Sequence, residues 1–409
     1  MAADERPLAG QPWLSAASSR AVLKALAAGG KPVRFVGGCV RDGLLGRSRD
    51  DQDLDLATPE HPADVLKLLA AAGLRAIPTG LAHGTVTAVV GSEHFEVTTL
   101  RQDVACDGRH AEVAFTDDFA ADAARRDFTI NAMSCDGEGR LYDYFGGRAD
   151  LAAGRVRFVG PAADRIAEDF LRILRFFRFF AHFGQPPADT EALEACRASA
   201  AEIERLSGER VQTEMLKLLE AHDPVPALRL MAETDVLAQV MPAAVGLERL
   251  ARLIALVPEA DSLLRLGALL RSPHADAADE VAARWRLATR DGARLQTLVA
   301  ADPIRLDASA AEHRRALYRL GAERFTDLVR LAAADTMDDA GPALAAAAKW
   351  QPRALPVTGD DVLEMGVPAG PRIGELLRTV EAWWLARDFQ PDRAACLAQL
   401  SSLLAEPET

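Results

Sequence analysis

The spacing of hydrophobic and polar residues divides the chain into two parts of different character. In the N-terminal part, short apolar runs alternate with amphipathic segments, a pattern typical of strands mixed with helices. The expected strands are residues 33–36, 53–57, 85–90, 94–99 and 155–159. The expected helices are residues 21–28 and 62–72, with a further helix starting within 41–45. Gly91 and Ser92 favour a hairpin between two of the strands, so we expect a mixed sheet.

The rest of the chain is rich in alanine and leucine and predicts helices throughout. A helix is expected over residues 163–183, because Pro161 precedes it and Gly184 follows it. Residues 351–358 form a proline-containing break before a small tail. The predicted fold class is therefore multidomain α+β, with an N-terminal head that combines a mixed β-sheet and helices, followed by all-α segments.

Composition adds limits on the class of protein. The 409 residues are 49% hydrophobic and 26% charged, which is typical of folded multidomain chains. No apolar stretch reaches the roughly 18–20 residues that a membrane span needs, and the first residues lack the pattern of a signal peptide. We therefore expect a cytoplasmic protein with no membrane partner. Five scattered cysteines favour reduced thiols over a disulfide framework.

The formal net charge of −13 argues against unselective binding to polyanions, yet it leaves room for a local basic surface. A candidate anion site follows the first strand, where Gly37 and Gly38 lead into a helix start at Arg41. Two glycines before a helix let backbone N–H groups approach a phosphate, and the helix dipole favours the negative charge.

Asp53 and Asp55 lie two apart on an expected strand, so both carboxylates project from the same face. Such a pair can share divalent cations, and Mg²⁺ prefers this hard-oxygen arrangement. An isolated acidic pair is more often a solvated face, but the neighbouring glycine turn favours the metal interpretation. Glu96 adds a third carboxylate if its strand lies beside 53–57.

Two further polar clusters follow along the chain. Arg125 and Arg126 precede a mixed helix, and arginine forks match phosphate oxygens, while Asn131 suits a ribose hydroxyl. The alternative is a surface ion-pair cluster. In the second cluster, charged residues recur at every third position of the helix expected over 163–183. This spacing predicts a polar stripe on an apolar helix. Its members are Asp169, Arg172, Arg175 and Arg178. The alternative is an amphipathic helix with a narrow wet face.

In order and spacing, these clusters resemble the motifs of class II CCA-adding enzymes, the tRNA nucleotidyltransferases related to bacterial poly(A) polymerases. The resemblance covers residues 33–220 and returns at 359–374. It implies four domains: a catalytic nucleotidyltransferase head at 1–155, a neck with nucleotide-selecting helices at 156–222, a helical body at 223–350 and a tRNA-binding tail at 351–409. Residues 142–151 resemble the family's hinge. Residues 99–115 resemble its mobile loop and contain the polar positions Arg101, Asp103, Asp107, Gly108 and Arg109.

The resemblance also implies an activity and roles for the residues. The expected reaction adds CMP, CMP and AMP to the 3′ end of tRNA from CTP and ATP without a nucleic-acid template, with release of pyrophosphate. Asp53 and Asp55 would hold two Mg²⁺ ions, and Glu96 would join them as a catalytic residue. The implied nucleotide-binding residues are Gly37, Gly38, Arg41, Arg126, Asp127, Asn131, Asp169, Arg172, Arg175 and Arg178. The expected partners are tRNA and nucleoside triphosphates, and not DNA.

Base choice has a simple edge-chemistry explanation. Cytosine and adenine both present an amine donor beside a ring-nitrogen acceptor, which suits a carboxylate at Asp169 and a guanidinium at Arg172. Glu209, Arg210 and Glu214 resemble the helix that supports this pair. Three alternatives stay open: a poly(A) polymerase, a partial enzyme that adds only CC or only A, and a catalytically silent tRNA-binding protein. The residues that contact tRNA are unknown; Arg314, Arg315, Arg319 and Arg372 are candidates for phosphate contacts.

Overall fold

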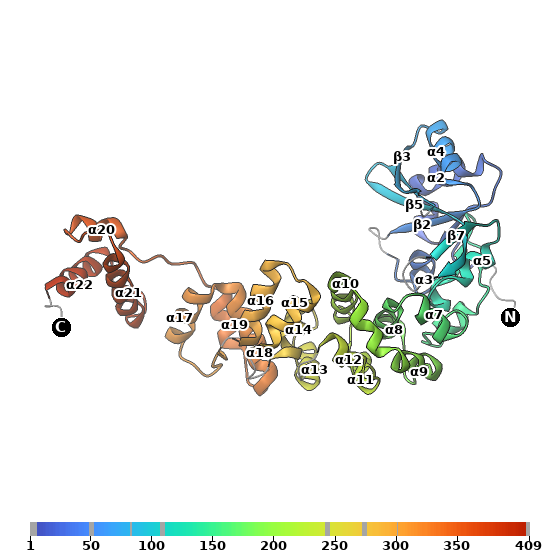
Figure 1. Ribbon diagram of the computed structural model, residues 1–409. Helices are drawn as coiled ribbons and strands as arrows, with labels where there is room; N and C mark the ends of the chain where they lie inside the picture. The colour runs from blue at the N-terminus through green and yellow to red at the C-terminus, as the bar shows by residue number, and fades with distance from the viewer. Residues whose placement is uncertain are drawn as a thin grey trace. The chain divides into compact units, whose positions relative to one another are not determined.

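A computed structural model gives the fold and describes residues 6–48, 53–81, 84–106, 111–241, 246–271, 276–300 and 302–405 (Figure 1). For residues 103–106 and 111–113 it describes the backbone alone. Of the expected loop positions, Asp107, Gly108 and Arg109 therefore lie outside the described residues. The chain forms two compact units. The first is Met1–Ala244 with Val281–Leu287, and the second is Val245–Glu280 with Ala288–Thr409.

The first unit is built on a mixed sheet, as the sequence predicted. Within the described residues the sheet has seven strands in the order β3-β4-β5-β2-β1-β8-β9. The strands are β1 Arg34–Val36, β2 Leu54–Thr58, β3 Arg75–Gly80, β4 Thr85–Val90, β5 Glu93–Thr99, β8 Ser134–Cys135 and β9 Leu141–Tyr142. β2 runs parallel to β5, and the other neighbours are antiparallel. The hairpin turn at Gly91 joins β4 to β5, as expected, and Gly91 has the positive φ of +63° that such a turn needs.

The register of β2 explains why its polar residues share one face. Leu54 and Leu56 are buried, whereas Asp55 between them is half-buried, because successive side chains of a strand point to opposite faces. In the parallel ladder Asp55 is paired with Glu96 of β5. β5 therefore lies beside β2, as the expectation for Glu96 required.

The helices of the first unit surround this sheet and extend beyond it. α4 packs against β3, β4 and β5, and α3 packs against β1 and β2 (Figure 1). A separate hairpin joins β6 Arg101–Cys106 to β7 Ala111–Phe115. The helical elements are α1 Pro12–Ser15, α2 Ala17–Ala27, α3 Gly38–Leu44, α4 Pro62–Ala71, α5 Phe119–Ala124, η2 Thr129–Asn131, α6 Gly147–Ala152, α7 Ala162–Glu168, α8 Leu171–Phe183, α9 Thr190–Ala198, η3 Ala200–Arg205, α10 Gly208–Leu219, α11 Val225–Glu233 and α12 Val236–Val240.

The helix expected over 163–183 is in fact two helices, so that prediction was wrong. The chain breaks between α7 and α8, where Asp169 has an extended backbone (φ −158°, ψ 109°). The Asp169 carboxylate accepts the Leu171 backbone N–H at 3.1 Å, so the side chain replaces a helical hydrogen bond. The expected strand 155–159 was also wrong: Phe158 makes a single isolated bridge with Phe128. The first helix after β1 starts at Gly38, ahead of the predicted 41–45.

An aromatic cluster fixes α8 to the segment that carries the Arg125-Arg126 motif. The rings of Phe128 and Phe158 lie 4.8 Å apart, and Phe176 of α8 stacks on Phe158 at 5.9 Å. These three side chains are almost completely buried. Burying such rings stabilises a fold by several kcal/mol in total, so α8 is held firmly against this segment.

The second unit contains the remaining helices. They are α13 Leu247–Leu256, α14 Ser262–Leu270, α16 Thr289–Ala300, α17 Ala310–Leu320, α18 Ala322–Thr336, α19 Gly341–Ala348, α20 Gly359–Glu364, α21 Pro371–Ala386 and α22 Arg393–Ala405; α15 Ala277–Trp285 is divided between the two units. Tyr318 of α17 packs its ring on Trp384 of α21 and on Phe389, at 5.8 and 5.6 Å. Residues 351–405 are thus joined to the helices before them, and the four-domain division stays a prediction.

Arg314, a candidate for tRNA contact, is engaged in this same junction. Its Nε donates to Asp388 at 2.8 Å, and Arg372 contacts Glu375 at 3.3 Å. No helix among the described residues is long and apolar enough to cross a membrane.

Gly147 of α6 lies in the segment that resembles a hinge, and its substitution tests how closely α6 packs against η2. A Cβ at Gly147 would lie 2.1 Å from the backbone oxygen of Thr129 in η2, an overlap that only backbone movement relieves. We expect Gly147→Ala to lower the free energy of unfolding by about 1–3 kcal/mol. Gly374→Ala is the matched control, because its Cβ would meet only the Arg378 side chain at 3.6 Å. In chemical denaturation the control should be neutral or slightly stabilised; equal effects of the two changes would contradict the packing described.

Candidate active site

A polar cavity of about 680 Å³ in the first unit gathers the motifs that the sequence singled out. Its lining residues are Gly37, Gly38, Arg41, Asp53, Asp55, Arg125, Arg126, Asp127, Asn131, Asp169, Leu171, Arg172, Arg175, Arg178, Phe179 and Arg210. All the predicted nucleotide-binding residues and both predicted metal ligands are in this set. Glu96 is not, although it is paired with Asp55 across the sheet.

Gly37 shapes the cavity at the end of β1. Its φ of +74° disfavours any side chain. A Cβ there would point between the Nη1 atom of Arg126 (3.6 Å) and the Oδ2 atom of Asp55 (3.9 Å). The missing side chain therefore leaves open the space between a cation and a carboxylate, and α3 begins at the next residue without a side-chain cap, which suits an anion at this helix end.

Asp53 and Asp55 form a donor set that suits a divalent cation. Burial, followed by the nearby charges of Glu96 and Asp53, raises the pKa of Asp55 to about 6, although Arg126 opposes the rise. Carboxylates that disfavour one another's charge in this way are relieved by a bound cation. Among the described residues no group of three or more acidic, histidine or cysteine side chains is placed to hold a metal. The donor chemistry of two carboxylates suits Mg²⁺, which keeps much of its water and takes its remaining ligands from substrate phosphates.

The two arginines of the next motif are fixed by Asp122, a residue that the sequence reasoning missed. Asp122 is buried, and its carboxylate accepts from Arg125 Nε at 2.9 Å and from Arg126 Nη2 at 3.2 Å. It also accepts the backbone N–H of Arg101, where the β6–β7 hairpin begins. The sequence spacing could have revealed Asp122, because an acidic residue three and four positions before two arginines lies close to both of them on a helical turn.

Asp127 connects this motif to α8. Its Oδ2 accepts from Arg175 Nε at 2.8 Å, and its Oδ1 accepts from the Phe128 N–H at 2.8 Å and from Asn131 Nδ2 at 3.2 Å. Asn131 in turn accepts from Arg41 Nη1 at 2.7 Å. Burial raises the pKa of Asp127, but the Arg175 charge and these hydrogen bonds outweigh it and hold the pKa below its ordinary value. Asp127 therefore lies inside the protein network and positions its neighbours.

The predicted polar stripe is present in part: Arg172, Arg175 and Arg178 lie on α8 and line the cavity, whereas Asp169 lies before the helix. Asp169 lies in the break before α8 and accepts from Arg210 Nη2 of α10 at 2.7 Å. Arg172 is paired with Glu168 and donates to the backbone oxygens of Arg165 (2.9 Å) and Arg125 (3.1 Å). Asp169 and Arg172 both line the cavity, each held by a separate partner.

α10 supplies the remaining counter-charge, as expected for a supporting helix. Glu214 is buried and forms ion pairs with Arg178 at 2.7 Å and with Arg175 at 3.7 Å. The cavity lining contains seven arginines and four aspartates, so it carries an excess of positive charge even on an acidic protein. Such a lining is suited to a polyanionic ligand that brings a divalent cation.

Comparison with known proteins first defines the class. Residues 33–157 match the poly A polymerase head domain family, and residues 189–246 match the probable RNA and SrmB-binding site of polymerase A. The fold and the cavity are thus those of a nucleotidyltransferase with a poly A polymerase type of head.

Curated relatives and solved structures then give the family. The mitochondrial CCA tRNA nucleotidyltransferase 1 of Homo sapiens is 33% identical over 90% of this chain and 86% of its own, and that of Danio rerio is 35% identical over 90% and 87%. The crystal structure of the Bacillus stearothermophilus CCA-adding enzyme in complex with CTP has a TM-score of 0.76 and 28% identity, covering 96% of this chain and 98% of that one. The chain belongs to the CCA-adding tRNA nucleotidyltransferase family.

The Asp127–Arg175 pair gives a prediction with a defined pH dependence. Arg175→Met would leave the buried Asp127 carboxylate without its cation, so we expect a loss of about 3–5 kcal/mol in the free energy of unfolding at neutral pH. Burial would then raise the pKa of Asp127 in the folded variant above its unfolded value near 4. The loss should therefore shrink as pH falls through the raised folded pKa towards the unfolded value, because the carboxyl of the folded variant becomes protonated.

Two variants serve as controls for this measurement by denaturation at pH 7 and pH 4. Adding Asp127→Asn to Arg175→Met removes the unpaired buried charge and should restore part of the free energy of unfolding. Arg205→Met breaks the exposed pair with Glu202 and should cost less than about 1 kcal/mol. An Arg175→Met loss that is the same at both pH values would refute the assignment.

Proposed function

We propose that the protein adds CMP, CMP and AMP to the 3′ end of tRNA, using CTP and ATP and without a nucleic-acid template. The observation that carries this proposal is that one cavity, on a chain of the CCA-adding family, combines a carboxylate pair, an excess of arginines and the Asp169/Arg172 pair. In each step the terminal 3′-hydroxyl of tRNA attacks the α-phosphate of the nucleotide. A new phosphodiester bond forms, the bond to the β-phosphate breaks, and pyrophosphate leaves with the hydroxyl proton passing to solvent.

The residues of the sheet edge and of α3 bind and orient the nucleotide in this proposal. Asp53 and Asp55 would hold Mg²⁺, which supplies electrostatic stabilisation of the transferring phosphate and of the leaving pyrophosphate. Arg126 beside Gly37 and Arg41 beside Gly38 would contact the triphosphate. Glu96 would act through Asp55, its neighbour across the sheet. No side-chain base is required.

Base selection follows from the hydrogen-bonding groups that Asp169 and Arg172 retain. Three hydrogen bonds hold Arg172 among the described residues, so two of its five N–H groups remain for a base. Each carboxylate oxygen of Asp169 already accepts one hydrogen bond and has a second lone pair to offer. Cytosine and adenine match this donor and acceptor. Guanine and uracil present the reverse pattern and leave polar groups unpaired, which costs orders of magnitude in efficiency.

Product length tests the function directly and separates it from the alternatives. The purified protein is incubated with tRNA that ends before CC, before A, or after CCA, with each nucleotide supplied alone or together. The proposal predicts two C additions, then one A, and no extension of complete tRNA. Continued addition of A would favour a poly(A) polymerase, a stop after CC or addition of A alone would favour a partial enzyme, and no product would favour a silent tRNA-binding protein.

The acidic residues give the first prediction of this proposal. We expect Asp53→Asn or Asp55→Asn to lower kcat at least about a thousandfold, because several kcal/mol of transition-state stabilisation are lost. Glu96→Gln should lose about tenfold to a hundredfold. Glu93→Gln, at the exposed start of the same strand, is the control and should be silent. Single-turnover incorporation with saturating tRNA measures each effect, and near-normal turnover of either aspartate variant would exclude the metal assignment.

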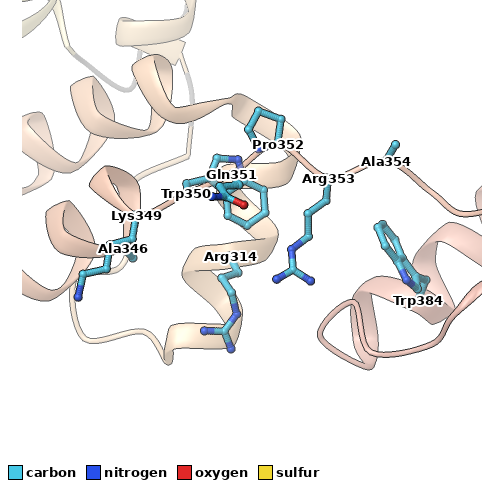
Figure 2. A pocket seen from close by; sticks show the side chains of 9 residues that line it. All are labelled: Arg314, Ala346, Lys349, Trp350, Gln351, Pro352, Arg353, Ala354 and Trp384. Carbon is cyan, nitrogen blue, oxygen red and sulfur yellow. The ribbon is translucent and has the colours of Figure 1, made fainter.

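We also propose that residues 351–409 take part in tRNA binding. A cavity of about 600 Å³ in the second unit is lined by Arg314, Lys349, Arg353, Trp350 and Trp384, among others (Figure 2). Arg314 is committed to Asp388, whereas Lys349 and Arg353 are exposed. The Arg353 guanidinium lies over the Phe389 ring at 5.0 Å, which holds it in place. Exposed cations beside aromatic rings suit the sugar-phosphate backbone of RNA.

The double change Lys349→Ala with Arg353→Ala tests this surface. We expect weaker tRNA binding and a slope of log affinity against log salt that is smaller by about 1–2, because two phosphate contacts are lost. CTP affinity should not change. Arg305→Ala removes an exposed arginine that is paired with Asp307, and it should leave both measurements as they are. An unchanged salt slope in the double variant would refute the proposal.

A further inference from the structure

The cavity contains one feature that charge pairing alone does not explain. Phe179 is the only aromatic side chain among the described residues that line it. Three guanidinium carbons lie over its ring, those of Arg178 at 4.5 Å, Arg175 at 5.3 Å and Arg41 at 5.4 Å from the ring centre. All three distances are within the roughly 6 Å at which a ring attracts a cation.

We infer that Phe179 is a positioning residue for the triphosphate of the bound nucleotide, because it holds Arg41, Arg175 and Arg178 together on one wall of the cavity. The inference rests on the proposed function, since it takes a nucleoside triphosphate as the anion that this wall receives. Phe179 would act through the arginines and would not itself contact the reacting atoms.

The three arginines carry like charges and gather around the Phe179 ring, so attractive contacts must offset their repulsion. Each has an acidic partner: Asp42 accepts from Arg41 at 2.9 and 3.0 Å, Asp127 accepts from Arg175, and Glu214 pairs with Arg178. Carboxylates bind the N–H groups at the edge of a guanidinium, whereas an aromatic ring attracts its face. The ring contact and the acid contact are therefore compatible.

The ring itself is fixed, so it can serve as a reference point. Phe179 is 7% exposed, lies 5.1 Å from the Phe128 ring and stacks on the Phe183 ring at 5.8 Å. Phe183 also has Arg41 over its ring at 4.1 Å. Because the ring is buried and the arginines are held by acidic partners, less ordering is needed when a triphosphate binds.

The matched pair Phe179→Leu and Phe176→Leu tests the inference in the full-length protein. Both residues are on α8 and both changes keep an apolar side chain, but the Phe176 ring packs against other phenylalanines. Phe179→Tyr keeps the ring and is the conservative variant. The measurements are the affinities for CTP and for CMP in the absence of tRNA, by calorimetry, together with the melting temperature of each variant.

We expect Phe179→Leu to weaken CTP binding about tenfold and to change CMP binding less than about threefold, because the loss falls on the β- and γ-phosphates. Phe179→Tyr should bind CTP as the unchanged protein does. Phe176→Leu should lower the melting temperature without weakening CTP binding. The ratio of CTP and ATP use to UTP and GTP use should stay the same in Phe179→Leu.

Three results would overturn the inference: unchanged CTP affinity in Phe179→Leu, an equal loss in Phe176→Leu, or an equal loss in Phe179→Tyr. Because nucleotide affinity is measured without tRNA, these outcomes are distinct from a failure of CCA addition by the unchanged protein. That failure would count against the proposed function. The role of Phe179 in triphosphate binding would still be decided by the affinities for CTP and CMP.

Discussion

The arrangement of the cavity depends on the buried Asp127 carboxylate. One of its oxygens holds Arg175 of α8, and the other holds Asn131, which in turn holds Arg41 beside the glycine turn. A buried carboxylate is tolerated only where cations and donors satisfy it, so the two structural elements must meet at this point. Asp127 thereby links α8, which follows the break at Asp169, to Arg41 of α3.

The same network explains how an acidic protein can present a cationic site. Asp122, Asp127 and Glu214 are buried and hold arginines from the inside, while the opposite ends of those guanidiniums line the cavity. Their side chains are ordered in advance, which reduces the cost of binding a polyanion. The two residues proposed to select the base have other partners: Asp169 is held by Arg210, and Arg172 is paired with Glu168.

Local spacing along the sequence predicted the strands and helices of a mixed sheet, the carboxylate pair at the start of β2 and the arginine pair, because these features depend on a few neighbouring residues. The position of Glu96 required a strand order, which spacing does not contain. The break at Asp169 was missed because the apolar pattern continues through it, and only the Asp169 side chain interrupts the backbone bonds. Three members of the predicted stripe lie on α8, whereas Asp169 lies before it and is held by Arg210 of another helix, a tertiary contact that no local pattern records.

In the proposed function the protein itself, through Asp169 and Arg172, recognises the edge of the incoming base. The most direct measurement is kcat/KM for all four nucleoside triphosphates in Asp169→Ala and in Arg172→Ala. We expect each change to lower the use of CTP and ATP together and to narrow their advantage over UTP and GTP, by roughly tenfold or more for each charge-assisted hydrogen bond lost. Full discrimination among the four nucleotides in either variant would contradict it.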